Sequence, residues 1–318
     1  MSVSKRMGPV EWALLATLSV LWGGSFFFVK VALRELPPFV IVQCRVLVAA
    51  LALLCLLKAL GLSLPRGRAA WKALFAMALL NNVIPFSCIV WGQTLIGSGL
   101  AAILNSATPL FTVLAAHCVT QDEKLSAARL SGVLLGMAGV AVLLGMDTIS
   151  LSGASVVGQA AVLAAAVSYT FAALYGRRFA GQPPLVVATG QVCASSLMMT
   201  PLTLMMDSPW TLAFPGAATL ASVAGLALAS TALAYVLYFR ILARAGAANL
   251  SLVTLLIPVS AVTLGCLVLG ETIIPGQAAG MALIFSGLAT IDGRLVGVVR
   301  RAVCGGKLKP CTGDDYHI

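Results

Sequence analysis

The sequence predicts an all-α integral membrane protein with ten transmembrane helices, arranged as two inverted five-helix repeats, with both termini in the cytoplasm. Three observations carry this prediction: the composition, a series of ten apolar runs, and an internal duplication. Of the 318 residues, 60% are hydrophobic and 9% are charged, whereas soluble domains carry about 25% charged residues. So few charges argue strongly against a water-soluble fold.

The ten apolar runs are each long enough to cross a bilayer, which takes about 20 residues in a helix. Short connections rich in proline and glycine, such as Pro37-Pro38 and Pro183-Pro184, separate them. The runs cover residues 12–33, 37–60, 71–91, 95–119, 126–146, 154–175, 184–206, 212–239, 246–269 and 275–298.

The basic residues predict the sidedness, because Lys and Arg near the ends of spans are retained on the cytoplasmic side. With the N-terminus inside, only Lys30 and Arg34 fall outside and Arg45 lies within the second span, which leaves 17 of the 20 Lys and Arg on the cytoplasmic side. This bias explains the net charge of +10 and requires no nucleic-acid partner.

The two halves resemble each other at a nearly constant offset. Pro37 and Pro183 are 146 residues apart, Pro109 and Pro258 are 149 apart, and Glu123 and Glu271 are 148 apart. A five-helix unit that is duplicated must enter the membrane the second time from the opposite side. We therefore predict one repeat over residues 10–146, an inverted second repeat over 154–298, and a cytoplasmic tail over 299–318.

Four segments resemble the EamA domain of the drug/metabolite transporter superfamily, present twice. They are LWGGSFFFVKVAL in the first run, PPFVIVQCRVLVAALAL in the second, AAILNSATPLFTVLAA in the fourth, and the Glu-Gly-Gly spacing that follows. The resemblance covers about residues 10–295. It implies a ten-helix secondary carrier in the bacterial inner membrane, and many members of this family export amino acids or other metabolites.

The two prolines at matching places, Pro109 and Pro258, predict broken helices beside a central binding site, because a missing backbone donor frees a carbonyl that must face protein or water. Asn105 and Thr108 shortly precede the first proline, and Thr254 shortly precedes the second. The alternative is a kink that only shapes helix packing.

Arg45 is the most informative single residue. It lies eight residues past Pro37, hence roughly 12 Å into its helix at 1.5 Å per residue. A charge at this depth costs on the order of 2.5 to 3.5 kcal/mol on insertion scales, and no carboxylate occurs at comparable depth in any run. Arg45 either binds or gates an anionic solute group, or it bonds backbone carbonyls in a structural role. The resembling family also has a basic residue here, which leaves both roles open.

Further polar or aromatic residues within the spans are candidates for the same substrate-binding or gating site. Trp22 and Ser25 lie near the middle of the first span, and Trp22 either lines a cavity or fills the core. Lys30 either snorkels to the interface or faces the cavity, as its match to the family's lysine suggests. The remaining candidates are Asn81 and Asn82, which match Ser230 and Thr231 at the 149-residue offset, together with Tyr235 and Tyr169. Hydrogen bonding between helices would also explain these polar residues.

These features together predict a secondary active transporter that moves a small organic solute by alternating access, as an exporter. A zwitterionic or anionic metabolite, amino acids included, fits Arg45 and the lack of buried acids. Among transporters, the alternative is a cationic multidrug exporter. Among other classes of protein, the alternatives are an intramembrane enzyme and a non-transporting membrane component. No nucleotide-binding or nucleophile-elbow motif occurs, so we expect no cofactor, no enzymatic activity, and coupling to a proton, other ion or solute gradient. The expected partners are the solute and the bilayer; the oligomeric state stays open.

Overall fold

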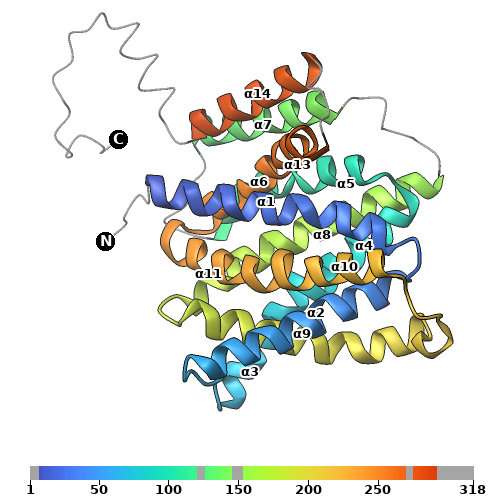
Figure 1. Cartoon of the computed structure of the whole chain (residues 1–318). Coiled ribbons are helices and arrows are strands. Elements are labelled where there is room, and N and C mark those ends of the chain that lie inside the picture. The colour runs from blue at the N-terminus through green and yellow to red at the C-terminus, as the bar shows by residue number, and fades with distance from the viewer. Residues whose placement is uncertain (1–6, 120–125, 145–152, 270–274, 292–318) are drawn as a thin grey trace, which may run out of the picture.

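The computed structural model describes residues 7–119, 126–144, 153–269 and 275–291, and within these ranges all regular structure is helical (Figure 1). The α-helices are α1 Pro9–Ala32, α2 Pro38–Ala59, α3 Arg68–Ala78, α4 Ile84–Leu95, α5 Ser98–Asn105, α6 Thr108–Val119, α7 Ala127–Leu144, α8 Gly153–Gly176, α9 Pro184–Met206, α10 Ala217–Ala227, α11 Ala234–Ala245, α12 Ala247–Ser251, α13 Val253–Leu269 and α14 Pro275–Ile291. Two π-helical turns, η1 Leu79–Val83 and η5 Leu228–Leu233, and two short 3₁₀ turns, η3 Arg177–Phe179 and η4 Pro209–Thr211, complete the set.

The helices reproduce the predicted apolar runs. Seven helical segments in the described part of the chain are long and apolar enough to cross a membrane, and residues 127–142, 249–260 and 278–291 form shorter apolar helices. Pro38, Pro184 and Pro275 occupy first helical positions, where the missing N–H has no intrahelical partner to lose. The prediction of an all-α integral membrane protein is confirmed. The predicted tail, residues 299–318, lies outside the described residues.

A π-helical turn interrupts the same span in each half of the chain. η1 joins α3 to α4, η5 joins α10 to α11, and the two turns begin 149 residues apart. In η5 the Thr231 hydroxyl donates to the Leu226 carbonyl five residues earlier, at 2.7 Å. Such turns are rare within helices and are frequently found at functional sites. They place Asn81, Asn82, Ser230 and Thr231 inside the bundle.

Helices α2 and α9 run antiparallel. The carboxylate of Asp207, just after α9, accepts a hydrogen bond of 2.9 Å from the Val40 N–H in the first turn of α2, and Thr203 donates to the Phe39 carbonyl at 3.1 Å. One turn further along α2, Gln43 donates to Thr200 at 3.1 Å. The start of α2 therefore meets the end of α9.

Helices α7 and α14 are also antiparallel and lie side by side at one edge of the bundle (Figure 1). A Cβ atom added to Gly287 would lie 2.5 Å from the Gly132 carbonyl oxygen, and one added to Gly139 would lie 2.7 Å from that of Gly280. The early residues of α7 thus face the late residues of α14. Only glycine at these positions allows the two backbones to approach so closely.

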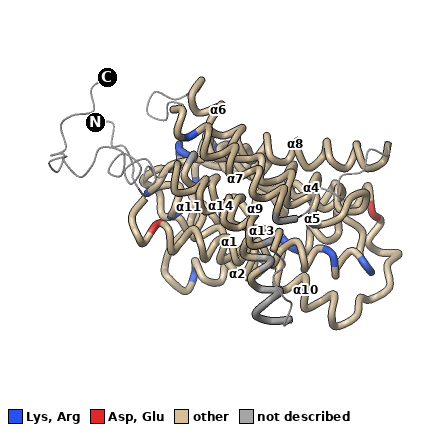
Figure 2. The backbone as a smooth tube through the Cα atoms, turned by 90° about the horizontal axis from the view of Figure 1, so that it is seen from above, with Lys and Arg blue, Asp and Glu red and all other residues tan. Residues whose placement is uncertain are grey.

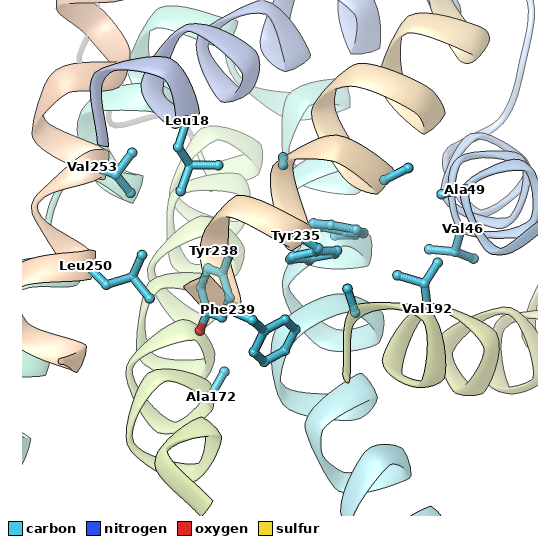
Figure 3. Close-up of a cluster of buried hydrophobic side chains, with 14 of the residues drawn as sticks. Leu18, Val46, Ala49, Ala172, Val192, Tyr235, Tyr238, Phe239, Leu250 and Val253 are labelled. Carbon is cyan, nitrogen blue, oxygen red and sulfur yellow. The ribbon is translucent and has the colours of Figure 1, made fainter. Parts of the chain in front are cut away.

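The aromatic side chains of α11 lie at the centre of the main core. Figure 3 shows Tyr235, Tyr238 and Phe239 between residues of α2 and α9 on one side and Leu250 and Val253 on the other. Tyr235 and Tyr238 are 1% and 4% exposed. Because α11 follows directly from η5, the π-helical turn sets where these rings point.

Charged residues are sparse along the chain, and most of the backbone in Figure 2 is tan, the colour of the uncharged residues. The acidic residues that the structure describes lie at helix ends, as the sequence predicts. Glu11 pairs with Arg244 at 3.1 Å, Glu35 accepts the Gly216 N–H at 2.7 Å, and Asp207 binds the start of α2. The interior of the described bundle is thus left without a carboxylate.

Candidate functional site

A cavity of about 750 Å³, its open side included, lies between the two halves of the chain. Eight of the predicted site residues line it: Trp22, Ser25, Arg45, Asn81, Asn105, Thr108, Tyr169 and Thr254. The structure therefore gathers these residues from both halves around one space.

Two helices each present one face to this cavity. The lining residues of α1 are 22, 25, 26 and 29, and those of α4 are 86, 89, 90 and 93. This spacing of three, four and seven residues is one face of an α-helix. Trp22 lines the cavity and also packs against the hydrophobic core, so it fits both interpretations that the sequence leaves open.

Arg45 is buried, with 5% of its surface exposed, and lines the cavity. Its Nε donates to the Thr231 hydroxyl at 2.7 Å, and Nη2 donates to the Ser230 carbonyl at 3.2 Å. The guanidinium carbon lies 3.6 Å from the centre of the Phe86 ring, in a cation–π contact. The α10–α11 span and Phe86 thus fix the position of the charge.

Arg45 has no carboxylate partner in the described part of the chain. The three acidic residues that lie there, Glu11, Glu35 and Asp207, bind elsewhere. A guanidinium has five N–H donors, and the two bonds to Ser230 and Thr231 occupy only two of them. The sequence expectation of a buried cation without a matching acid holds for these residues, and Arg45 has both charge and donors to offer to a ligand.

Two further predicted residues, Asn82 and Tyr235, belong to a hydrogen-bond network beside the cavity. The Tyr235 hydroxyl donates to the Asn82 side-chain oxygen at 2.5 Å, and the Asn81 carbonyl, at 3.0 Å, is a second acceptor that shares the same proton. Gln191 also donates to that Asn82 oxygen, at 2.6 Å, and the Asn82 amide donates to Ser195 at 2.6 Å. Asn82 and Gln191 are fully buried. These bonds join α9, η1 and α11, so Asn82 and Tyr235 act as interhelical links.

Arg45 and Gln191 occupy equivalent places in the two halves. They are 146 residues apart, as are Pro37 and Pro183. Each side chain bonds to the π-helical turn of the opposite half, Arg45 to η5 and Gln191 to η1. Arg45 borders the cavity, whereas Gln191 is not part of its lining. Arg45 is thus charged and lines the cavity, whereas its counterpart Gln191 is neutral and lies outside the lining.

The two prolines do not break their helices in matching ways. Residues 106–107 separate α5 from α6 just before Pro109, as expected. In the second half the interruption lies at Leu252, and Pro258 sits inside continuous α13. The expectation of a break at Pro258 is corrected: the helix is interrupted six residues earlier, at Leu252, and Thr254 donates to the Ser251 carbonyl there at 2.9 Å. Both prolines are buried but outside the cavity lining.

Seven of the predicted site residues do not line the cavity, and two polar residues that do line it were not predicted. Outside the lining are Lys30, Asn82, Pro109, Ser230, Thr231, Tyr235 and Pro258. Lys30 is exposed and does not line the cavity. Gln93 and Tyr238, which were not singled out, do line it. Both side-chain atoms of the Gln93 amide, the Asn105 oxygen and the Tyr238 hydroxyl are buried without a hydrogen-bond partner among the described residues. Buried polar groups without partners are costly, and these atoms are available to a solute.

Helical spacing in the sequence could have indicated both residues. Tyr238 follows Tyr235 by three residues, and Gln93 follows Phe86 by seven.

Comparison with known proteins agrees with this architecture. A protein known by its crystal structure is 21% identical, covers 91% of this chain and 97% of its own, and superposes with a TM-score of 0.73, which shows a shared fold. The "Uncharacterized inner membrane transporter YedA" of Escherichia coli strain K12 is 25% identical over 85% of this chain and 86% of its own. The "Probable terminal-alkyne amino-acid exporter" of Streptantibioticus cattleyicolor is 28% identical over 95% and 99%.

The model of the EamA-like transporter family matches twice, at residues 10–145 and 156–291. The two matches together cover most of the chain. The family and the named relatives are transporters rather than enzymes, which sets aside the intramembrane-enzyme alternative. The chain is an integral membrane protein that belongs to the EamA-like transporter family and carries its domain in two repeats.

Proposed function

We propose that this protein is a secondary active transporter of the bacterial inner membrane that exports a small organic metabolite bearing a carboxylate, such as an amino acid or a related anion. The cavity between the repeats is the binding site, and the repeats move so that it opens alternately to each side. The absence of a nucleotide-binding motif in the sequence favours an ion or solute gradient as the energy source. Export, and an amino-acid-like solute, find support in the name of the Streptantibioticus relative.

The transport model rests on ten spans in two inverted repeats, with both termini in the cytoplasm. Helices α2 and α9 are corresponding spans of the two repeats and run antiparallel, as do α7 and α14. Corresponding helices that point in opposite directions are what inversion requires. The Lys and Arg bias of the connections supports cytoplasmic termini.

The observation that carries the proposal is Arg45, a buried cation at the edge of the cavity with no carboxylate partner in the described chain. An unpaired charge inside a membrane protein is expensive and marks ion or substrate pathways. A solute carboxylate accepts two N–H bonds from a guanidinium in a favourable planar geometry. A cationic drug would instead place a second positive charge near Arg45, so the multidrug alternative ranks lower.

Cysteine accessibility tests the alternating cavity without knowledge of the solute. In a variant whose eight native cysteines are replaced, we expect Asn105→Cys and Thr254→Cys to react with small polar maleimides applied from either side of the membrane. Both positions line the cavity. Asn82→Cys is the matched control, since residue 82 is fully buried in the neighbouring network, and we expect it to stay unlabelled. Labelling of 105 and 254 from one side only would contradict alternating access.

A further inference from the structure

We propose that the preferred solute is a monoanionic carboxylate whose other polar groups are neutral, rather than a zwitterion with a free ammonium. This inference rests on the proposed function and narrows its substrate class. It follows from the charge balance of the cavity and from the kind of polar groups that remain unpaired in its lining.

The described lining of the cavity carries one positive charge and no negative one. Arg45 is its only ionised side chain, and the other polar lining groups are amides, hydroxyls, phenols and an indole. A bound monoanion makes this site neutral. A zwitterion of an α-amino acid makes equivalent contacts through its carboxylate but adds an ammonium only a few ångströms from the guanidinium. Like charges at such a distance repel strongly where water is scarce.

The unpaired groups of the lining suit neutral partners. The Gln93 amide offers an NH₂ donor group and an acceptor oxygen, Asn105 offers an acceptor oxygen, and Tyr238 offers a hydroxyl. An amide or hydroxyl on the solute satisfies such groups without bringing a charge. Recognition of an ammonium by an acid would require an Asp or Glu in this lining, and the described lining contains none.

The equivalence of Arg45 and Gln191 identifies a suitable test variant. Glutamine is accommodated at the equivalent place in the second repeat, where it bonds to η1 through Asn81 and Asn82. Arg45→Gln therefore removes the charge while leaving a side chain that can reach the corresponding polar pair, Ser230 and Thr231. We expect this variant to fold, which keeps the test informative.

Four leucine compounds of similar shape differ in whether they carry the carboxylate, the ammonium, both or neither. N-acetylleucine is a monoanion, leucine a zwitterion, N-acetylleucinamide neutral and leucinamide a cation. Apparent dissociation constants are measured by ligand-dependent thermal stabilisation of the purified full-length protein. We expect N-acetylleucine to bind about tenfold more tightly than leucine, or better, and leucinamide to bind most weakly. In Arg45→Gln the advantage of N-acetylleucine over N-acetylleucinamide should fall to near unity.

Leucine binding as tightly as N-acetylleucine would overturn this inference and leave the carrier proposal standing. Absence of binding by all four compounds would also overturn the inference, while the cysteine test, which uses no solute, judges alternating access separately. Tightest binding of leucinamide would overturn both the inference and the role of Arg45 in binding a carboxylate.

Discussion

Arg45→Ala is expected to reduce solute counterflow in proteoliposomes at least about 30-fold, because truncating one partner of a buried, hydrogen-bonded charge pair costs about 2–5 kcal/mol, and each 1.4 kcal/mol is a factor of about ten. The bonds from Arg45 to Thr231 and Ser230 and the Phe86 ring fix the guanidinium at the cavity edge. Without it, the cavity has no charged group in its described lining with which to bind a carboxylate. Counterflow of a panel of carboxylate metabolites measures the loss directly.

Two controls separate this effect from a general loss of basic charge. Arg178 is exposed and contacts Tyr175, so Arg178→Ala should transport as the wild type does. Arg45→Lys keeps the charge but loses the planar fork that binds a carboxylate through two bonds, and an intermediate rate is expected. If Arg45→Ala moves every solute as fast as the wild type, Arg45 does not bind the solute.

Gly287→Leu is expected to be the most damaging single change to the fold. A Cβ atom at this position would lie 2.5 Å from the Gly132 carbonyl oxygen and 2.7 Å from the Gly136 nitrogen. Both are backbone atoms, so no side-chain rotation relieves the clash and α7 and α14 must separate. Overpacking typically costs about 1–3 kcal/mol and occasionally more, and a leucine between two backbones belongs at the upper end. We expect a clear fall in the apparent Tm, measured by size-exclusion chromatography of the detergent-solubilised protein after heating.

Gly276→Ala is the matched control in the same helix. Nothing lies within 4 Å of a Cβ atom at Gly276, and alanine favours helix more than glycine does. This variant should melt at or slightly above the temperature of the wild type. A wild-type Tm for Gly287→Leu would show that the close packing of α7 on α14 contributes little to stability.

Hydropathy alone predicted the helical segments well, because each helix in a bilayer must satisfy its own backbone. The run 184–206 and helix α9 have the same bounds, and the run 37–60 differs from α2 by one residue at each end. The π-helical turns were not predicted, since nothing in local composition distinguishes residues 79–83 from the helix on either side. They depend on partners distant in sequence, such as Gln191 for Asn82.

Only part of the candidate site could be predicted from the sequence. Arg45 could be singled out because an intramembrane charge is conspicuous in sequence, and Asn105 and Thr254 because they lie near prolines. Gln93 was missed, because a glutamine near a helix end is indistinguishable in sequence from an interfacial residue. The position of the helix break at Leu252, rather than at Pro258, could not be predicted either. A proline favours a kink in its helix but does not determine the residue at which the helix is interrupted.

Protection of the cavity by its solute tests the central claim most directly. The measurement is the rate of maleimide labelling of Asn105→Cys in the cysteine-free background, with and without N-acetylleucine, in proteins that carry Arg45 or Arg45→Gln. The account predicts that the solute slows labelling when Arg45 is present and has little effect when glutamine replaces it. Equal protection in both proteins would contradict the claim that a solute occupies this cavity by binding Arg45.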